Sequence, residues 1–193
     1  MKEYHIKLSW FDRKRKLILT ESYIEFEGGD LIGKTMVKYF QDDIVDYKHS
    51  NDWIVWYRFT VGRQFNISVK MRSGEELKLM FKSFFGLGSN TFEQYAEIVK
   101  HIWDHYVVHR VDELLDQLSC GNAIHMLGVT VDQVGVHDHH QKITYPWENV
   151  ATQEYYNYFA CYHNQNATLN TRIDFDAFGA EILLCVIKKK RCQ

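Results

Sequence analysis

Two stretches decide the fold of this chain: Tyr39-Phe-Gln-Asp-Asp-Ile44 and Tyr145-Pro-Trp-Glu-Asn-Val150. Both begin with Tyr, carry an acidic residue at the fourth position and Asp or Asn at the fifth, and end on a β-branched aliphatic residue. An aromatic-rich segment follows each of them along the chain. Because internal similarity indicates a repeated structural unit, the segments on either side of the two stretches are expected to match as well.

The segments around the first stretch alternate between apolar and polar residues, which is typical of half-buried antiparallel strands. In the first segment Tyr4, Ile6, Leu8 and Trp10 share one face. The alternation recurs at residues 17–19, 24–26, 53–61, 65–71 and 77–81. Turn-forming residues separate these segments, among them Val61-Gly-Arg63. A meander of strands is therefore predicted over residues 1–82.

At residue 90 the apolar residues begin to recur at intervals of three and four, the spacing of an amphipathic helix. Asn90 with Glu93 forms a capping-box pair at its start, and Gly121 is the expected stop. About 28 residues would span about 42 Å, which is longer than a single small sheet requires, so the far end should contact something else. The pattern drifts at residues 107–109, which predicts a bend or two successive helices there.

The second half of the chain returns to strands and ends in a helix. Short strand-like segments occupy residues 124–129, 131–136, 143–147, 155–162 and 169–175. A helix is expected at about 177–191, with Asp176 as its cap, although Leu183-Leu-Cys-Val-Ile187 also fits a buried strand. The predicted modules are residues 1–118, which end in the long helix at about 90–118, and residues 119–193.

A strand meander closed by one amphipathic helix, entered at an aromatic-acidic-aliphatic step, resembles the pleckstrin-homology (PH)-like superfold. Residues 39–44 and 145–150 resemble the strand-entry step of bacterial PH-like and GRAM-like domains. The resemblance implies a mainly β (α+β) fold of two tandem antiparallel barrel or sandwich modules, each followed by a helix, the first helix linking them. The second module is short by about two strands, so either its barrel is incomplete or residues 4–10 pair with its sheet.

Composition excludes several classes of protein. The chain has 193 residues and a formal net charge of -2, which supplies no diffuse positive field for nucleic acid. It has no leading apolar segment and no apolar run of about 18 residues, so we expect a cytoplasmic protein without a membrane anchor. Because no CxxC pair occurs, we expect four reduced thiols, at Cys120, Cys161, Cys185 and Cys192.

His137-Asp-His-His140 is the densest set of potential metal ligands. On a strand, His137 and His139 would share one face about 6 to 7 Å apart. A metal would need a third ligand from a neighbouring strand, such as His125 or His163. The alternative is a polar hairpin turn, in which case no cofactor is expected.

No pattern in the sequence is typical of a catalytic site. Cys161 and His163 would be neighbours on one face of a strand, but a thiol in an aromatic strand is typically packed and inert. Gly86-Leu-Gly-Ser89 lacks the Lys of a phosphate-binding loop and is expected to be an ordinary connection. We therefore predict no catalytic residue and no enzymatic activity.

The predicted function is that of a noncatalytic protein-interaction or scaffolding protein. Residues 155–162 are aromatic at both parities, so one face is left to pack against the long helix of the same chain, against a second copy or against a partner protein. An intramolecular or dimer contact is favoured over stacking on nucleic acid, because the segment lacks interleaved Arg and Lys. One alternative is a metal or small-molecule site at His137 and His139. Another is a peripheral membrane adaptor that uses Lys188, Lys189, Lys190 and Arg191, whose charges supply about 4 kcal/mol and so only transient attraction to anionic lipid.

Overall fold

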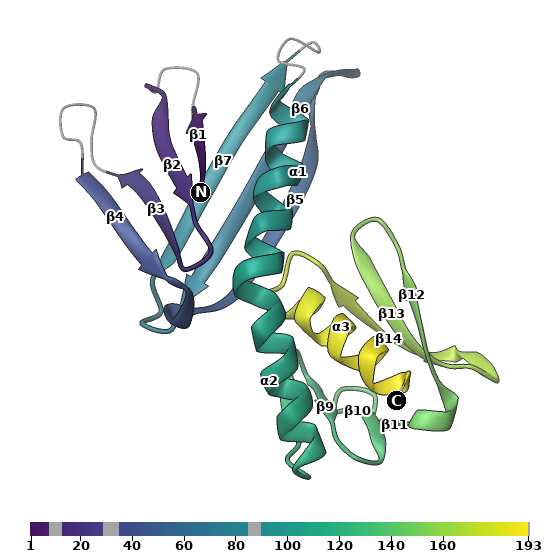
Figure 1. Cartoon of the computed structure of the whole chain (residues 1–193). Coiled ribbons are helices and arrows are strands. Elements are labelled where there is room, and N and C mark those ends of the chain that lie inside the picture. The colour runs from purple at the N-terminus through teal and green to yellow at the C-terminus, as the bar shows by residue number, and fades with distance from the viewer. Residues whose placement is uncertain (8–12, 29–34, 85–89, 193) are drawn as a thin grey trace. The chain divides into compact units, whose positions relative to one another are not determined.

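The computed structural model of the chain describes residues 1–7, 13–28, 35–84 and 90–192. It divides into two compact units, Met1–Val108 and His109–Gln193 (Figure 1). The described strands form four antiparallel sheets, so the predicted mainly β fold class is confirmed. None of these described sheets closes into a barrel. The boundary between the units falls at Val108, whereas the sequence places it at residue 118.

The first unit combines a four-stranded sheet, a three-stranded sheet and a helix. The sheets have the orders β1-β2-β3-β4 and β5-β6-β7, so each is a meander of consecutive strands. The strands are β1 (Lys2–Ile6), β2 (Arg15–Leu19), β3 (Tyr23–Gly28), β4 (Thr35–Phe40), β5 (Ile44–Trp56), β6 (Phe59–Met71) and β7 (Glu76–Phe84). The helical segments that follow are α1 (Asn90–Ile102) and a π-helical turn (Trp103–Val107), and they continue into α2 (Val108–Ser119), which belongs to the second unit from His109 onward.

Strand β1 belongs to the first unit. It pairs with β2, with Tyr4 opposite Leu17. The Tyr4 hydroxyl donates a hydrogen bond of 2.9 Å to Glu97 of α1, in the same unit. The hypothesis that residues 4–10 pair with the second sheet is therefore wrong for residues 4–7, and residues 8–10 lie outside the described residues.

The turn between β5 and β6 lies at Tyr57-Arg58, and the predicted turn at Val61-Gly-Arg63 is wrong. Tyr57 has a φ of 57°, the left-handed conformation that tight hairpin turns require. Gly62 instead lies within β6, where a Cβ atom would stand 2.2 Å from the backbone oxygen of Ser83. This glycine is therefore explained by the close approach of β7 and not by a turn.

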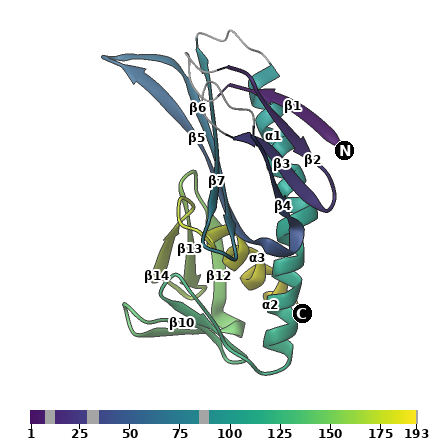
Figure 2. The same cartoon turned by 90° about the vertical axis from the view of Figure 1, so that its left-hand side faces the viewer.

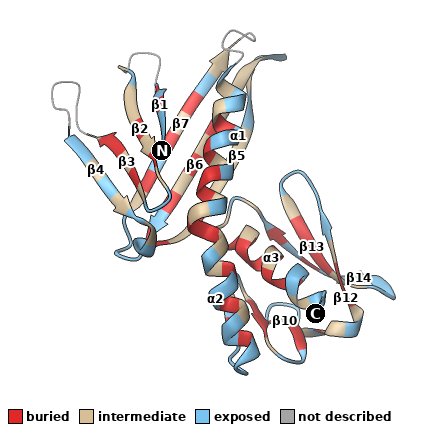
Figure 3. Cartoon of the chain, viewed as in Figure 1, coloured by how far each residue is buried: buried red, intermediate tan, exposed pale blue. Residues whose placement is uncertain are grey.

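An aromatic cluster joins α1 to the three-stranded sheet of the first unit. Phe65 of β6 is 1% exposed, and its ring centroid lies 5.8 Å from Phe81 of β7 and 4.9 Å from Tyr95 of α1. The Tyr95 hydroxyl lies 2.7 Å from Nδ1 of His49 on β5. The cluster belongs to the buried stripe of α1 and β6, which is red in Figure 3. It therefore ties the helix to all three strands.

The π-helical turn lies close to the predicted irregularity at residues 107–109. Tyr106 and Val107 are consecutive and are only 2% and 1% exposed. The Tyr106 hydroxyl contacts the carbonyl oxygen of Thr20 and lies 2.9 Å from that of Tyr23. The extra residue of a π turn re-phases the helix, which allows both neighbours to reach the core. The helix is therefore irregular close to the predicted position, and the irregularity is a π-helical turn that begins at Trp103.

His101 makes the stability of the first unit pH-dependent. Burial lowers its pKa, and the hydrogen bond from Nε2 to the Thr20 carbonyl, at 2.8 Å, offsets this only in part. Because the unfolded ring titrates at about pH 6.5, the full stability is present above that pH and declines as the pH falls below it. Urea unfolding between about pH 7.5 and about pH 5 should show this decline, and His101→Gln should flatten it. The exposed-site variant His5→Gln should retain the wild-type decline.

The second unit, like the first, contains a four-stranded and a three-stranded sheet, and it holds two helices, α2 from His109 onward and α3 (Ala180–Arg191). Its sheets have the orders β11-β10-β9-β8 and β12-β13-β14. The strands are β8 (Ile124–Met126), β9 (Val129–Val131), β10 (Gly135–Asp138), β11 (Ile143–Pro146), β12 (Val150–Glu154), β13 (Tyr158–His163) and β14 (Asn166–Asp174). The predicted deficit of two strands is therefore wrong.

Short strands explain that error. Residues 124–129 contain β8, a turn at Leu127-Gly128 and the start of β9, and both turn residues have a positive φ. Strands β8 and β9 are three residues long each, which is too short for alternation to reveal them. Strand β12 was not predicted at all, because only Val150 and Ala151 of its five residues are buried.

Helix α3 confirms the helical interpretation of residues 183–187 over the buried strand. It begins at Ala180, later than predicted, and Asp176 lies in the turn before it. The N-cap is Gly179, which has a φ of 87° and makes no side-chain capping hydrogen bond. Asp176 is therefore not the cap.

The two matching stretches of sequence form the same local structure. Tyr39 lies on β4, a 3-10 turn follows at Gln41–Asp43, and β5 begins at Ile44. Tyr145 lies on β11, a 3-10 turn follows at Trp147–Asn149, and β12 begins at Val150. Each stretch therefore carries the chain from the four-stranded sheet of its unit to the three-stranded sheet.

Candidate functional site

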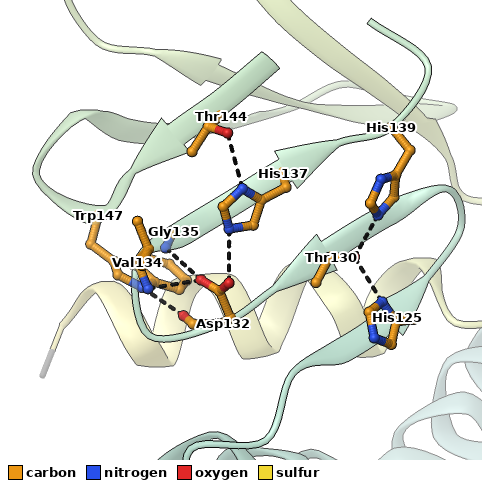
Figure 4. A network of polar contacts seen from close by, with 9 residues as sticks. All are labelled: His125, Thr130, Asp132, Val134, Gly135, His137, His139, Thr144 and Trp147. Atoms are coloured by element: carbon orange, nitrogen blue, oxygen red, sulfur yellow. Dashed lines mark hydrogen bonds and ion pairs between the residues drawn. The ribbon is translucent and has the colours of Figure 1, made fainter. Parts of the chain in front are cut away.

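One face of the four-stranded sheet in the second unit gathers histidine and threonine side chains (Figure 4). His125 of β8 and His137 of β10 are both paired with Thr130 of β9. Paired residues of neighbouring strands point to the same side of a sheet. His139 follows β10 and turns back to Thr130. The three imidazoles thus lie on one face, but His139 stands in the turn after β10 and not on the strand, so residues 138–141 form the polar hairpin turn that the sequence offered as the alternative.

Thr130 is shared by two of these rings. Its Oγ1 lies 2.7 Å from Nδ1 of His125 and 2.5 Å from Nε2 of His139. A hydroxyl donates one hydrogen only, so at most one of the two rings accepts it and at least one ring donates its own N–H to the threonine oxygen. The hydroxyl therefore couples the tautomers of His125 and His139.

His137 has different partners. Its Nε2 lies 2.9 Å from Asp132 Oδ2, and its Nδ1 lies 3.0 Å from Thr144 Oγ1. Asp132 also accepts backbone hydrogen bonds from Val134 and Gly135. Burial alone raises the pKa of Asp132, but these hydrogen bonds outweigh it, and the pKa lies below its usual value. Asp132 is thus ionised at neutral pH and holds His137 as an Nε2–H donor.

These contacts do not assemble a metal centre. Across residues 1–7, 13–28, 35–84 and 90–192, no group of three or more His, Cys, Asp or Glu side chains is placed to hold a metal ion. His163 is on β13, where its Nδ1 accepts a hydrogen bond from the backbone of Gln165. The metal role of His137 and His139 stays a prediction without a third ligand.

A buried polar network lies inside the second unit. Asp138 is 3% exposed and accepts hydrogen bonds from the Thr171 hydroxyl, at 2.5 Å, and from the backbone of His140 and Gln141. Thr171 in turn contacts the hydroxyl of the fully buried Tyr145, at 3.0 Å. This network joins β10 and β11 of one sheet to β14 of the other.

Cys161 faces this network and is not activated. Burial and the nearby Asp138 carboxylate raise the pKa of its thiol to about 12. It therefore carries no thiolate at neutral pH, which is the form a nucleophile needs. All four cysteines of the chain are free thiols.

The turn between β12 and β13 presents tyrosines to solvent. Tyr155 is 50% exposed and Tyr156 is 73% exposed. The Tyr155 ring stacks on Tyr158, with centroids 4.6 Å apart, and the Arg172 guanidinium lies 4.2 Å from the Tyr158 centroid. We call Tyr155, Tyr156, Tyr158 and Arg172 the tyrosine tip. Its three tyrosines lie within residues 155–162, for which the sequence predicts an intramolecular, dimer or partner contact, and Arg172 is added from β14.

A second exposed aromatic group lies at the equivalent turn of the first unit, between β5 and β6. Its members are Trp53, Val55, Trp56, Tyr57 and Phe59, with exposed fractions of 54%, 60%, 70%, 91% and 72%, and we call them the tryptophan tip. They present roughly 600 Å² of apolar surface, as large as the largest patch of a typical monomer. Sequence reasoning missed this surface by assigning residues 53–61 to one strand, although apolar residues at both parities were a signal.

The basic residues at the end of α3 are partly occupied within their own unit. Lys188 forms an ion pair with Glu154, and Lys189 forms one with Asp112 at 2.8 Å. Lys190 and Arg191 form no ion pair with other described residues. Lys188 and Lys189 stay about half exposed despite these ion pairs, and the membrane contact of residues 188–191 stays a prediction. In the described ranges no helix combines the length and apolar character needed to cross a membrane.

Comparisons with known proteins identify no family for this chain. No protein-family model matches the sequence, and neither a curated protein nor a solved structure matches it.

The predicted loop at residues 86–89 lies outside the described residues.

Proposed function

We propose that this chain is a noncatalytic protein-interaction or scaffolding protein built from two PH-like modules. The order of elements supports the duplication: a four-stranded meander, a three-stranded meander and a helix occur in each unit. The two similar stretches, at residues 39–44 and 145–150, lie at the same step of this order. A shared fold carries no activity by itself, so the role is argued from the surface.

The observation that carries the proposal is the tyrosine tip. Tyrosine and arginine are enriched at the energetic centres of protein interfaces. Tyrosine buries a large area with two rotatable bonds, and the planar arginine guanidinium stacks on aromatic rings and donates several hydrogen bonds. Here Tyr158 is held between Tyr155 and Arg172, and Arg172 is held by Asp174 at 2.7 Å. These contacts pre-organise the tip, which lowers the entropy lost on binding. A partner protein is the occupant that matches this chemistry.

A photo-crosslinking residue in place of Tyr156 tests the proposal in the full-length chain. We expect one discrete adduct in cells, whose partner then binds the purified chain directly. Tyr155→Ala/Tyr158→Ala should weaken that binding about tenfold or more, as the loss of an interface centre does. An adduct between two copies of this chain would identify the partner as a second copy.

Tyr57→Ala is the matched control, because it removes an exposed tyrosine from the turn of the other unit. It should leave the affinity for the partner unchanged. Absence of an adduct, or equal affinity of the double variant and the wild type, would overturn the assignment to the tyrosine tip.

A further inference from the structure

The tryptophan tip projects from its sheet. Gly62 of β6 pairs with Phe84, the last described residue of β7, and beyond this pair β5 and β6 pair with each other but with no other described strand. Figure 2 shows this end of the β5–β6 ribbon standing away from β7. At about 3.3 Å per residue, the stretch from Ile54 to Tyr57 adds about 10 Å. That length equals the depth of about 5–10 Å to which interfacial segments enter a bilayer.

Apolar side chains surround the projecting tip. Successive residues of a strand point to opposite faces, so Trp53 and Val55 lie on one face of the ribbon and Trp56 on the other. Trp56 is paired with Phe59, and both are more than two-thirds exposed. Tyr57, at the apex, is 91% exposed. A flat partner surface would cover one face only, whereas a surrounding medium covers both faces and the apex together.

The charges of the tip favour an anionic surface. Arg58 is exposed at the apex, and the Arg63 guanidinium lies 3.8 Å from the ring centroid of Trp53. The one acidic residue of residues 51–64, Asp52, accepts hydrogen bonds from Ser50 at 2.7 Å and Asn66 at 3.0 Å, at the base of the ribbon. The apex therefore carries apolar and cationic side chains, and the acidic Asp52 lies away from it at the base of the ribbon.

We propose that the tryptophan tip inserts into the interface of a bilayer that contains anionic phospholipid. Tryptophan and tyrosine are the residues that concentrate at the level of lipid headgroups, because their rings are apolar with one polar group. Arginine next to them pairs with headgroup phosphate. This site lies on the first unit and is independent of the protein contact proposed for the second.

Flotation of the full-length chain with vesicles tests the proposal. We expect binding to phosphatidylcholine vesicles that contain about 30% phosphatidylserine, and weaker binding without it. Trp56→Ser/Tyr57→Ser should reduce the partition coefficient about tenfold or more. Arg58→Glu should reduce it several-fold on the anionic vesicles only. Because these side chains are exposed, the variants should melt at the wild-type temperature.

The matched control is Tyr155→Ser/Tyr156→Ser, which makes the same kind of change at the tyrosine tip and should bind vesicles as the wild type does. Brominated lipid should quench the tryptophan emission of the wild type and not that of Trp53→Phe/Trp56→Phe. Absence of vesicle binding by the wild type would overturn the proposal. So would binding that survives Trp56→Ser/Tyr57→Ser but is lost when the basic residues 188–191 are removed. Neither outcome affects the crosslinking test of the tyrosine tip.

Discussion

Replacing Asp138 by alanine should lower the free energy of unfolding of the second unit by about 3 kcal/mol. The substitution leaves the Thr171 hydroxyl and the backbone N–H groups of His140 and Gln141 without their acceptor inside the fold. Thr171 is buried, and a buried donor without its acceptor costs more than the net value of the hydrogen bond it loses, whereas His140 and Gln141 are exposed residues. Asp138→Asn keeps an acceptor oxygen and should cost about half as much.

The Asp138 carboxylate also makes the free energy of unfolding of the second unit decrease at low pH. Burial raises the pKa of Asp138, but the hydrogen bonds from Thr171, Gln141 and His140 outweigh this, and the pKa lies below its usual value. Its contribution is therefore complete above about pH 3.9, the unfolded value, and is lost as the pH falls through the folded pKa. Hydrogen exchange of the amides of residues 109–192 measures the effect. Asp176→Ala, at an exposed turn, is the control and should change little. A loss below about 1 kcal/mol for Asp138→Ala would contradict the network.

Replacing Phe65 by alanine should lower the free energy of unfolding of the first unit by about 4 kcal/mol. Its ring is 1% exposed and contacts Phe81 and Tyr95, so its removal opens a cavity between β6, β7 and α1. The neighbouring strands are hydrogen-bonded on both sides of β6 and have little freedom to collapse into the space.

Phe59→Ala is the matched control for Phe65→Ala, because it makes the same change on the same strand at a side chain that is 72% exposed. It should alter stability by less than about 0.5 kcal/mol. The exchange rates of residues 90–107 report the first unit, and those of residues 135–174 report the second. If Phe65→Ala accelerated exchange equally in both ranges, the units would not be independent in stability.

The general architecture was predictable, because it depends on local patterns. Period-two alternation revealed the strands of the first unit, and the change of spacing at Asn90 revealed the long helix. The similar stretches at residues 39–44 and 145–150 indicated a repeated step, and each forms a 3-10 turn between the two sheets of its unit. The short strands β8 and β9 escaped, because three residues cannot display a period.

The surfaces were less predictable than the elements. The tyrosine segment was identified from its aromatic residues, but residues 53–61 were assigned to a single strand, because the turn at Tyr57-Arg58 contains none of the residues that are typical of turns. Gly62 looked like the turn residue, although it is required by the close approach of β7. The pairing of His125 with His139 through Thr130 depends on strand register, which the sequence does not reveal.

The sequence by itself determined which residues alternate and where the helices lie. It also determined that residues 155–162 carry aromatic side chains on both faces of their strand. These are properties of neighbours along the chain. Only the tertiary structure decided that Asp138 is buried under Thr171, that β1 stays in its own unit and that the tryptophan tip projects beyond β7. Burial, register and exposure are set by residues far apart in the chain, whose packing free energies compete in three dimensions and leave no periodic trace in the sequence.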